Sequence, residues 1–577
     1  MTTIEGQRNA PLGAAQPDLL ARVQSTRTRA GAALIALVAI ALLPTLFAPF
    51  FADDYFHIEV ASNLSHALAH GWVLPIASAG AWWTPHGLSV QYFRPLVVLS
   101  FAADDLLYGH MAAGYHLTNL ALHGVGTLLV WAIARRILGR GFGAWAAAAL
   151  FAIHPCHTLA VGWVSGRTDV MAGVFYLAAF LAFLEGRPSP RRTTPCWKMW
   201  ALSLFFFALS LTAKEMALTF PLIILAHNGL KPEGQPLSRR LVAPGLAAAA
   251  AALYLAFRVW VLGGLKAPPT PFAFHLGDPG LLRHLVTAPF LYLADFVLFV
   301  PPDPMATEPF WTAHTFLFVV FVGVVLVTFS GTLKKAPDRR IAAWGLGWMG
   351  ITLLPVATLT VGEHFLYLPS VGYCILVGSQ LPADAARIDA KARRALAIVG
   401  SLVVIVCLVR TTMFTDLSRT SSRAIDETAS LLDGSPAATL LLMDDLPAAA
   451  ALAFPHAIKL ARPARSVKVE ILSLLPRVVP NASDRSIVTF SSPEHLEIRR
   501  RGGFLHSYLE RAFEGPHIPF RAGQVIDRGG YTVTILDVSG GHIDRFGVHL
   551  ADPAHTLVLR STPDGTIATL SHEVPSR

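Results

Sequence analysis

The sequence predicts an α-helical polytopic membrane protein with about eleven transmembrane helices, followed by a C-terminal soluble domain of mixed α and β structure. Three observations support this fold class. Of the 577 residues, 53% are hydrophobic and only 14% are charged, whereas soluble domains carry roughly a quarter charged residues. Apolar runs of near membrane length recur through the first 413 residues. Short alternating runs replace them afterwards.

The distribution of charge and cysteine excludes other classes of protein. The net charge of +9 is compatible with nucleic-acid binding, but the basic residues lie in short clusters between apolar runs and not in one patch. We therefore expect no nucleic-acid partner. The four cysteines, Cys156, Cys196, Cys374 and Cys407, show neither a disulfide framework nor the spacing of a zinc site.

The membrane domain is predicted to cover residues 31–413, after a cytoplasmic N-terminal tail of residues 1–30. The first apolar run, GAALIALVAIALLPTLFAPFF, ends without a small-residue cleavage site, so we interpret it as a retained span and not as a signal peptide. A helix needs about 20 apolar residues to cross the hydrocarbon core. The candidate spans are 31–51, 116–134, 143–157, 168–185, 199–213, 215–229, 241–262, 314–332, 341–361, 364–381 and 395–413.

Lysine and arginine residues orient these spans. With a cytoplasmic N-terminus, the inside segments carry 22 of them and the outside segments before residue 414 carry six, in agreement with the positive-inside rule. The apolar stretch 285–302 is not counted, because a span there would place the basic cluster 334–340 outside. We interpret it as an interfacial or re-entrant helix within an outer loop, 263–313. The other long outer loop is 52–115.

Residues 414–577 form the C-terminal domain. Alternating apolar residues predict strands in SVKVEIL, SIVTF, HLEIRR, YTVTILDV and TLVLRS. A helix is predicted in the segment that begins at Pro447. Eleven spans place this α+β domain on the outer side, which is the periplasm if the membrane is a bacterial inner membrane.

An acidic pair stands at the apolar edge of the first span. In FADDYFHIEV, Asp53 and Asp54 directly follow the apolar run. Such a pair is most often a solvated helix end. On the same predicted side, His154 and His157 in HPCH have the spacing of a metal pair, although a histidine beside a proline more often caps or packs. A divalent metal is therefore left open.

Basic residues on the outer side are more informative, because the positive-inside rule disfavours them there. Lys214 lies in SLTAKEMALTFP with almost no loop, and a charge so near the hydrocarbon usually has a partner. Together, Arg94, Arg167 and Lys214 can hold a lipid-linked phosphate. Internal ion pairs, such as Lys214 with Glu215, are the alternative.

Sugar transfer from a polyprenyl phosphate fits these residue types. Its phosphate leaving group needs no general acid, unlike the alkoxide in glycoside hydrolysis. One carboxylate must take the proton of the attacking hydroxyl, and cations must hold the departing phosphate. A carboxylate at the apolar edge with cations nearby supplies both.

Ordered motifs carry a resemblance to a known family. FADDYFHI resembles the first outer loop of the GT-C membrane glycosyltransferases, where an acidic pair ends an apolar stretch. The membrane region resembles the TMTC family of transmembrane and tetratricopeptide-repeat O-mannosyltransferases and its bacterial relatives. The segments that carry the resemblance are YFRPLVVLSFAADDLLYG, GYHLTNLALHGVGTLLV, LFAIHPCHTLAVGWVSGRTDVMAGVFYLAAF, LSLTAKEMALTFPLIIL, YLAFRVWVLGG and LLPVATLTVGEHFLYLPSVGYCIL.

The resemblance implies a GT-C-like fold and an inverting transfer of a sugar, mannose in that family, from a polyprenyl- or dolichyl-phosphate carrier. The acceptor hydroxyl lies on the outer face, and Asp53 or Asp54 acts as the base. The implied site lining consists of Arg94, His154, His157, Arg167, Asp169, Lys214, Glu215, Glu363 and His364.

Two departures from the family pattern stand out. His364 follows Glu363 where the family has arginine, so a permanent cation is replaced by a side chain that ordinarily titrates near neutral pH. The tetratricopeptide repeats are absent, so the acceptor is left open among protein, lipid and polysaccharide.

Two other functions remain as hypotheses. One is a transporter or flippase for a lipid-linked or anionic substrate, although the spans show no internal repeat. The other is an outer-face polymerase or ligase that uses diphosphate-linked glycans.

Overall fold

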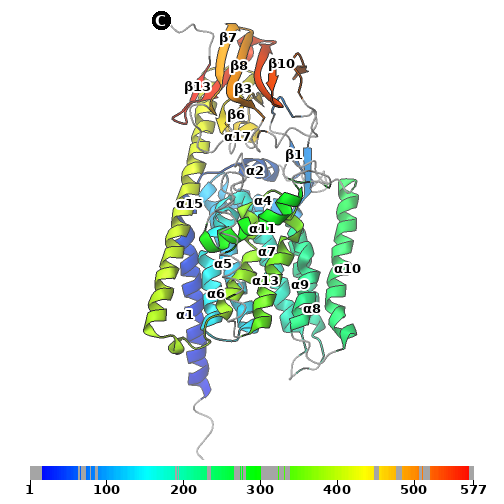
Figure 1. Cartoon of the computed structure of the whole chain (residues 1–577), viewed down its shortest axis with the longest axis vertical. Coiled ribbons are helices and arrows are strands. Elements are labelled where there is room, and N and C mark those ends of the chain that lie inside the picture. Colours follow the sequence, from blue (N-terminus) through cyan, green and yellow to red (C-terminus); the bar gives the residue numbers. More distant parts are fainter. Residues whose placement is uncertain are drawn as a thin grey trace, which may run out of the picture.

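A bundle of helices carries a strand-rich domain at one end in the computed structural model (Figure 1). Apart from a few single positions, the described residues are 16–62, 73–77, 80–84, 89–188, 194–230, 236–264, 281–299, 338–447, 454–475, 484–505 and 520–570. The end of the bundle that faces the strand-rich domain is called the domain end below.

Most helices of the bundle follow the predicted apolar runs, whereas α4 lies within the predicted outer loop 52–115. Their bounds are α1 Gln16–Leu42, α4 Pro95–Tyr108, α5 Ala112–Ile137, α6 Phe142–Ile153, α7 Arg167–Gly186, α8 Trp197–Leu211, α9 Phe220–Leu230, α10 Leu237–Leu262, α13 Arg339–Leu353, α14 Pro369–Ser379 and α15 Ala390–Asp433. In the part of the chain described, six helices are long and apolar enough to cross a membrane, or seven if the bent pair Phe142–Ile153 and Pro155–Gly162 is one span. The predicted span 314–332 lies almost wholly outside the described residues. The prediction of a polytopic helical membrane protein is confirmed, and the count of eleven stays a prediction.

Pro155 causes the bend between the helices Phe142–Ile153 and Pro155–Gly162. Helix α6 ends at Ile153, and the chain continues through Pro155 at an angle of 48°. Proline has no N–H to donate, so the helix ladder cannot continue through it. The bend brings the HPCH turn into the interior of the bundle, where His154 and His157 are buried.

Small residues let the helices of the bundle approach closely. A Cβ added at Gly143 of α6 would overlap the carbonyl oxygen of Gly378 in α14, and Gly345 of α13 faces Gly372 of α14 in the same way. Such contacts are typical of membrane helix packing. The outward faces of α10 and α15 are apolar and exposed, with Trp260 and Met413 among their residues, as expected of surfaces that face lipid.

Helix α11, Leu281–Leu298, falls in the stretch that we interpreted as interfacial or re-entrant. Its length and hydropathy would allow it to span a membrane. In Figure 1 it lies across the domain end of the bundle and not along the other helices.

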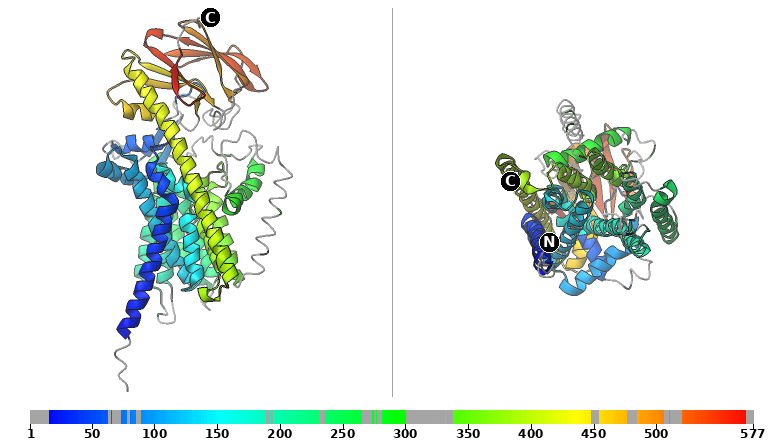
Figure 2. Two further views of the ribbon diagram at one scale, coloured as in Figure 1. Left: turned by 90° about the vertical axis from the view of Figure 1, so that its left-hand side faces the viewer. Right: turned by 90° about the horizontal axis from the view of Figure 1, so that it is seen from below.

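Helix α15 joins the bundle to the C-terminal domain. It runs for 44 residues beside α1 and rises beyond the bundle (Figure 2). The predicted domain boundary at residue 414 lies inside this helix, and the first strand of the domain begins at Leu440.

In its described residues, the C-terminal domain has two larger sheets over one apolar core and a two-stranded parallel sheet of β4, Leu446–Pro447, and β6, Leu474–Leu475. The first sheet has the order β13-β12-β3-β5, with β3, β5 and β12 parallel. The second is antiparallel with the order β7-β8-β11-β10-β9. The bounds are β3 Leu440–Asp444, α17 Phe454–Ala461, β5 Lys468–Ile471, β7 Ile487–Ser492, β8 His495–Phe504, β9 Val525–Asp527, β10 Tyr531–Ser539, β11 His542–Leu550, β12 Thr556–Ser561 and β13 Ile567–Thr569. Each of the five predicted strand segments overlaps one of these strands, and β7, β8 and β10 extend beyond the predicted ends.

The first outer loop belongs structurally to the C-terminal domain. After helix α2, Asp54–Ser62, it forms the hairpin of β1, Val73–Ala77, and β2, Ser89–Phe93. Between these strands, Trp82 is buried in the core of the C-terminal domain, and its Nε1–H donates to the Leu472 carbonyl oxygen at 2.8 Å. The loop is thereby fixed to the sheet that carries β5.

Candidate active site

Asp53 and Asp54 lie in a tight turn that leads into α2 at the domain end of the bundle. The Asp54 N–H donates to the Phe51 carbonyl oxygen at 3.1 Å, and Ala52 has a φ of 48°. A left-handed conformation costs energy for any residue with a Cβ, and it persists only where surrounding contacts impose it. The turn is therefore a constrained feature of the fold.

The carboxylate of Asp54 provides much of that constraint. Asp54 is fully buried, and its Oδ2 accepts the Phe51 N–H at 2.9 Å. Its Oδ1 accepts both the N–H and the hydroxyl of Ser165, at 2.7 and 2.6 Å. Burial raises the pKa of Asp54 to about 7, although these hydrogen bonds favour the ionised form. Asp54 thus ties the turn to the short segment Val164–Gly166.

The carboxylate of Asp53 is open by comparison. Its side chain is partly exposed, and no described residue donates a hydrogen bond to it. Burial raises the pKa of Asp53 to about 6, while the charges of His456 and Arg94 act in the opposite direction. An open carboxylate with a pKa of about 6 has the properties of a general base near neutral pH.

Arg94 and Arg258 both pair with the carboxylate of Glu215, and the charge of Arg94 acts on Asp53. Arg94 follows β2 and caps α4; its Nη2 lies 3.2 Å from Oε2 of Glu215. Arg258, near the end of α10, places its Nη2 3.2 Å from Oε1 of the same residue. The Arg94 guanidinium also stacks on the Tyr92 ring at 4.4 Å. The two guanidinium groups and the carboxylate of Glu215 together keep a net positive charge.

Lys214 is paired with Asp169. Its Nζ donates to Oδ1 and Oδ2 of Asp169 at 2.7 and 2.6 Å, and it lies 4.9 Å from the centre of the Phe365 ring. The partner is therefore Asp169 and not the neighbouring Glu215. The charges of Arg94 and Glu215 act on Lys214, so the pair belongs to the same electrostatic group.

Arg167 does not fit the predicted role of phosphate contact. Its side chain has no exposed surface. Its Nε donates to Asn119 Oδ1 at 2.7 Å, its Nη2 donates to the Tyr115 carbonyl oxygen at 2.9 Å, and the same nitrogen pairs with Asp104 at 2.5 Å. Because these acceptors already hold the guanidinium, Arg167 ties α4, α5 and α7 together.

The two histidines of HPCH are also packing residues in this structure. His154 accepts the Cys156 N–H on Nδ1 and contacts the Phe296 carbonyl oxygen through Nε2 at 3.3 Å. His157 Nε2 lies 2.9 Å from the Ser370 hydroxyl. Both rings are buried among aromatic side chains. They were predicted as site lining, and their hydrogen bonds within the bundle do not support that role.

Glu363 has a partner that the sequence motifs did not indicate. Its Oε2 pairs with Arg410 Nη2 at 2.5 Å, and Arg410 Nη1 pairs with Asp295 at 2.6 Å. A signal was present, since Asp295 and Arg410 are charges inside apolar stretches, where charges are rare and usually partnered. Arg410 thus places a permanent cation beside Glu363, although the next residue is histidine.

His364 lines the same electrostatic group. Its ring lies edge-on to Trp163 with centroids 5.9 Å apart. The charges of Lys214, Asp169 and Arg94 act on it.

The sequence did not point to His456 of the C-terminal domain. His456 lies on α17, and its Nδ1 is 2.7 Å from Oε2 of Glu59 on α2. The two residues are 397 positions apart. Glu59 belongs to the stretch FADDYFHIEV, but nothing in that stretch pointed to His456. Only the docking of α17 on α2 brings them together.

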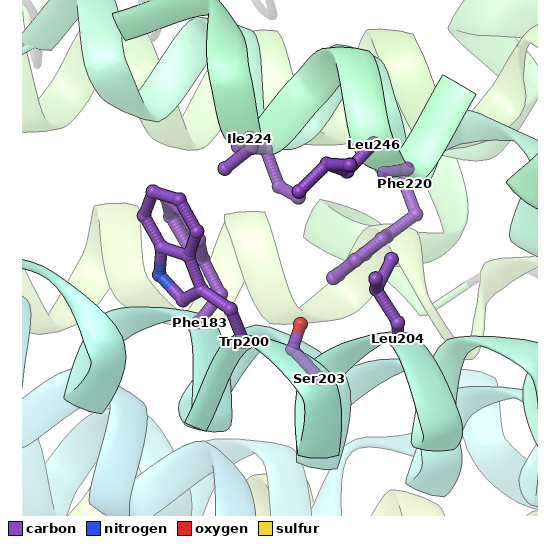
Figure 3. Close-up of a pocket in the computed structure, with 9 residues that line it drawn as sticks. Phe183, Trp200, Ser203, Leu204, Phe220, Ile224 and Leu246 are labelled. Carbon is purple, nitrogen blue, oxygen red and sulfur yellow. The ribbon is translucent and has the colours of Figure 1, made fainter. Parts of the chain in front are cut away.

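No cluster of potential metal ligands lies at the site in the part of the chain described. The group of three potential metal ligands found there, Glu494, His495 and His549, is exposed on the antiparallel sheet of the C-terminal domain. An open hollow of about 520 Å³ lies between the segment Leu46–Pro49, just before the acidic pair, and Arg419, Ser422, Arg423 and Asp426 of α15. Figure 3 shows an apolar space of about 10 Å³ between α7, α8, α9 and α10, lined by residues that include Trp200 and Phe220. That volume is about the size of one water molecule, so a sugar does not fit.

Comparison with known proteins identifies sequence relatives. No family model matches the chain. It is 35% identical over 207 residues to protein O-mannosyl-transferase Tmtc1 of Drosophila melanogaster, covering 35% of this chain and 23% of that protein. Protein O-mannosyl-transferase TMTC4 of Homo sapiens is 27% identical over 351 residues, covering 50% of this chain and 47% of that protein. The chain resembles the TMTC proteins.

The similarity to the TMTC proteins confirms the resemblance seen in the motifs, and the chain spans less than half the length of these relatives. Among solved structures, ArnT from Cupriavidus metallidurans bound to undecaprenyl phosphate is 12% identical, with a TM-score of 0.40 over 79% of this chain and 90% of that chain. The Archaeoglobus fulgidus oligosaccharyltransferase in its apo form is 13% identical, with a TM-score of 0.41 over 76% of this chain and 64% of that chain.

Proposed function

We propose that the protein is an integral-membrane glycosyltransferase. It transfers a sugar, mannose by analogy with the TMTC proteins, from a polyprenyl-phosphate carrier to an acceptor hydroxyl on the outer face of the membrane. The observation that carries this proposal is the contrast within the acidic pair. Asp54 is saturated by three hydrogen bonds, whereas the Asp53 carboxylate is open and lies in the field of Arg94.

The proposed reaction is a single displacement. The acceptor oxygen attacks the anomeric carbon from the side opposite the phosphate, and its proton passes to the Asp53 carboxylate. The bond between the anomeric carbon and the phosphate oxygen breaks, and its electron pair stays with the phosphate. The configuration at the anomeric carbon is inverted.

Arg94 and Arg258 are the proposed contacts of the departing phosphate. Glu215 holds both guanidinium groups but neutralises only one of the two charges, so the excess charge can favour the phosphate as its negative charge grows. Asp169 holds Lys214 in the same group, and His364 lines it. Asp54 and Ser165 fix the turn that presents Asp53.

Transfer by the purified full chain tests the proposal. The assay uses a polyprenyl-phosphate sugar labelled in the sugar and a membrane extract as the source of acceptors. Asp53→Asn should lower transfer by roughly 10²- to 10⁴-fold, the usual contribution of a general base. Asp416→Asn is the matched control, since Asp416 is 65% exposed on α15, and it should leave transfer unchanged.

Two outcomes would overturn the assignment. Full transfer by Asp53→Asn would remove Asp53 as the base. Transfer from a diphosphate-linked donor only would replace the proposed donor and favour a polymerase or ligase.

A further inference from the structure

The C-terminal domain contacts the helix that carries the acidic pair. On α17, the His456 Nδ1 lies 2.7 Å from Oε2 of Glu59, and Lys459 pairs with the other oxygen of the same carboxylate. The His456 ring also lies edge-on to Phe56, with centroids 5.3 Å apart. Phe56 and Glu59 are both on α2, which begins at Asp54. Contacts from α17 therefore act on the first two turns after Asp53.

This contact is reinforced from the other side of the first outer loop. The Ile471 N–H donates to the Gly80 carbonyl oxygen at 3.0 Å, and Arg528 donates to the Thr84 carbonyl oxygen at 3.0 Å. Ile471 belongs to β5, the strand that follows α17 in the chain. The loop is thus attached to the C-terminal domain both at α2 and at residues 80–84, which fixes the position of α17 over the turn.

The charges at this contact are arranged in series. The hydrogen bond from His456 holds the pKa of Glu59 well below its usual range, so Glu59 is ionised. The charge of His456 in turn acts on Asp53 and lowers its pKa. The other charged groups that act on Asp53 or respond to it are Arg94 and Tyr92 from the end of β2 and Asp54 from α2.

We propose, on the basis of the proposed transferase function, that His456 is a positioning residue contributed to the active site by the C-terminal domain. Anchored by Glu59, it holds α2 against α17 and so fixes the turn that presents the carboxylate of Asp53 to the acceptor hydroxyl. The C-terminal domain is then a working part of the site.

The sign of the expected pH effect follows from the arrangement of charges. The cation at position 456 lowers the pKa of Asp53, so its removal raises that pKa. A base with a raised pKa stays protonated up to a higher pH. The acidic limb of the pH profile of kcat/KM should therefore move to higher pH in His456→Gln.

The experiment measures kcat/KM for the full chain between pH 5 and pH 9. His456→Gln should lose roughly 3- to 10-fold at pH 6, which corresponds to a limb displaced by roughly 0.5 to 1 pH unit, and should approach wild-type activity above pH 8. Glu59→Gln should move the limb in the same direction. His456→Arg, which carries a permanent cation, should restore the limb to its wild-type position or below.

Lys459→Gln is the matched control. Lys459 also pairs with Glu59 but is 67% exposed, and its charge does not figure among those acting on Asp53. Its limb should stay in place. A loss in His456→Gln that is equal at every pH, or an unmoved limb, would overturn the positioning role. An inactive wild-type chain would instead overturn the proposed function.

Discussion

Asp54→Asn tests whether the two aspartates have different roles. Asp54 holds the turn through hydrogen bonds, whereas the Asp53 carboxylate is open. The substitution keeps the size of the side chain and replaces one acceptor oxygen with an NH₂ group. If the amide oxygen faces Ser165, the NH₂ group faces the Phe51 N–H, and one charge-assisted hydrogen bond becomes a contact between two donors. If the amide is turned around, both donors of Ser165 lose their acceptor.

The first orientation is the less costly and sets the magnitude. A hydrogen bond to a charged group contributes roughly 1.5–3 kcal/mol, and a buried donor left without an acceptor adds a penalty of similar size. We expect Asp54→Asn to lower the free energy of unfolding by about 3 kcal/mol. Asp53→Asn should change it by less than about 1 kcal/mol, because no hydrogen bond from a described residue is lost.

Unfolding of both variants in detergent micelles, followed side by side with transfer activity, checks this division. We expect a folded but inactive Asp53→Asn, and an Asp54→Asn that melts at a lower temperature and retains transfer in proportion to its folded fraction. The reverse pattern, with a destabilised Asp53→Asn and a stable, inactive Asp54→Asn, would refute the reasoning and exchange the two roles.

Three further variants follow from the contacts described. Arg410→Met should lower the free energy of unfolding by roughly 3–5 kcal/mol, because it leaves the carboxylates of Asp295 and Glu363 buried without their cation; denaturation in micelles measures this, and an unchanged stability would contradict it. Arg258→Gln should raise the KM for the lipid donor roughly tenfold, since one charge-assisted contact contributes roughly 1.5–3 kcal/mol. Initial rates at varied donor concentration measure this KM. An unchanged KM would show that Arg258 does not contact the phosphate. Trp82→Ala should cost roughly 3–5 kcal/mol and make the C-terminal domain more sensitive to limited proteolysis, because Trp82 is 1% exposed in the core of that domain; digestion at the wild-type rate would argue against it.

The sequence predicted most of the secondary structure because hydropathy and alternation are local properties. The apolar runs became α1, α5, α7 and α10, and the alternating runs became β5, β7, β8, β10 and β12. Along its whole length, a helix turns one face to the core or to lipid. The order of apolar residues in the sequence therefore reveals the helix. The boundary between the membrane domain and the C-terminal domain was harder to predict, because α15 continues through residue 414 without a break. Only the surroundings of the helix change along its length.

The candidate site was predicted in part. Composition and position selected the acidic pair and the cations near it, since charges at an apolar edge are costly and need a reason. Lys214 and Arg94 do lie together with Asp169 and Glu215. The contacts of Arg167 were not predicted, because its acceptors come from α4 and α5 and no local pattern shows that they converge on it.

By itself, the sequence determined that this protein is a chain of membrane helices with an acidic pair at the apolar edge and a strand-rich domain after them. Only the tertiary structure decided which aspartate is open, because Ser165 reaches Asp54 from 111 residues away. It alone also placed His456 on α2, from 397 residues beyond Glu59. Hydropathy acts residue by residue and can be read along the chain. A hydrogen bond or an ion pair depends on a distance of a few ångströms between segments, and that distance is set only when the segments pack.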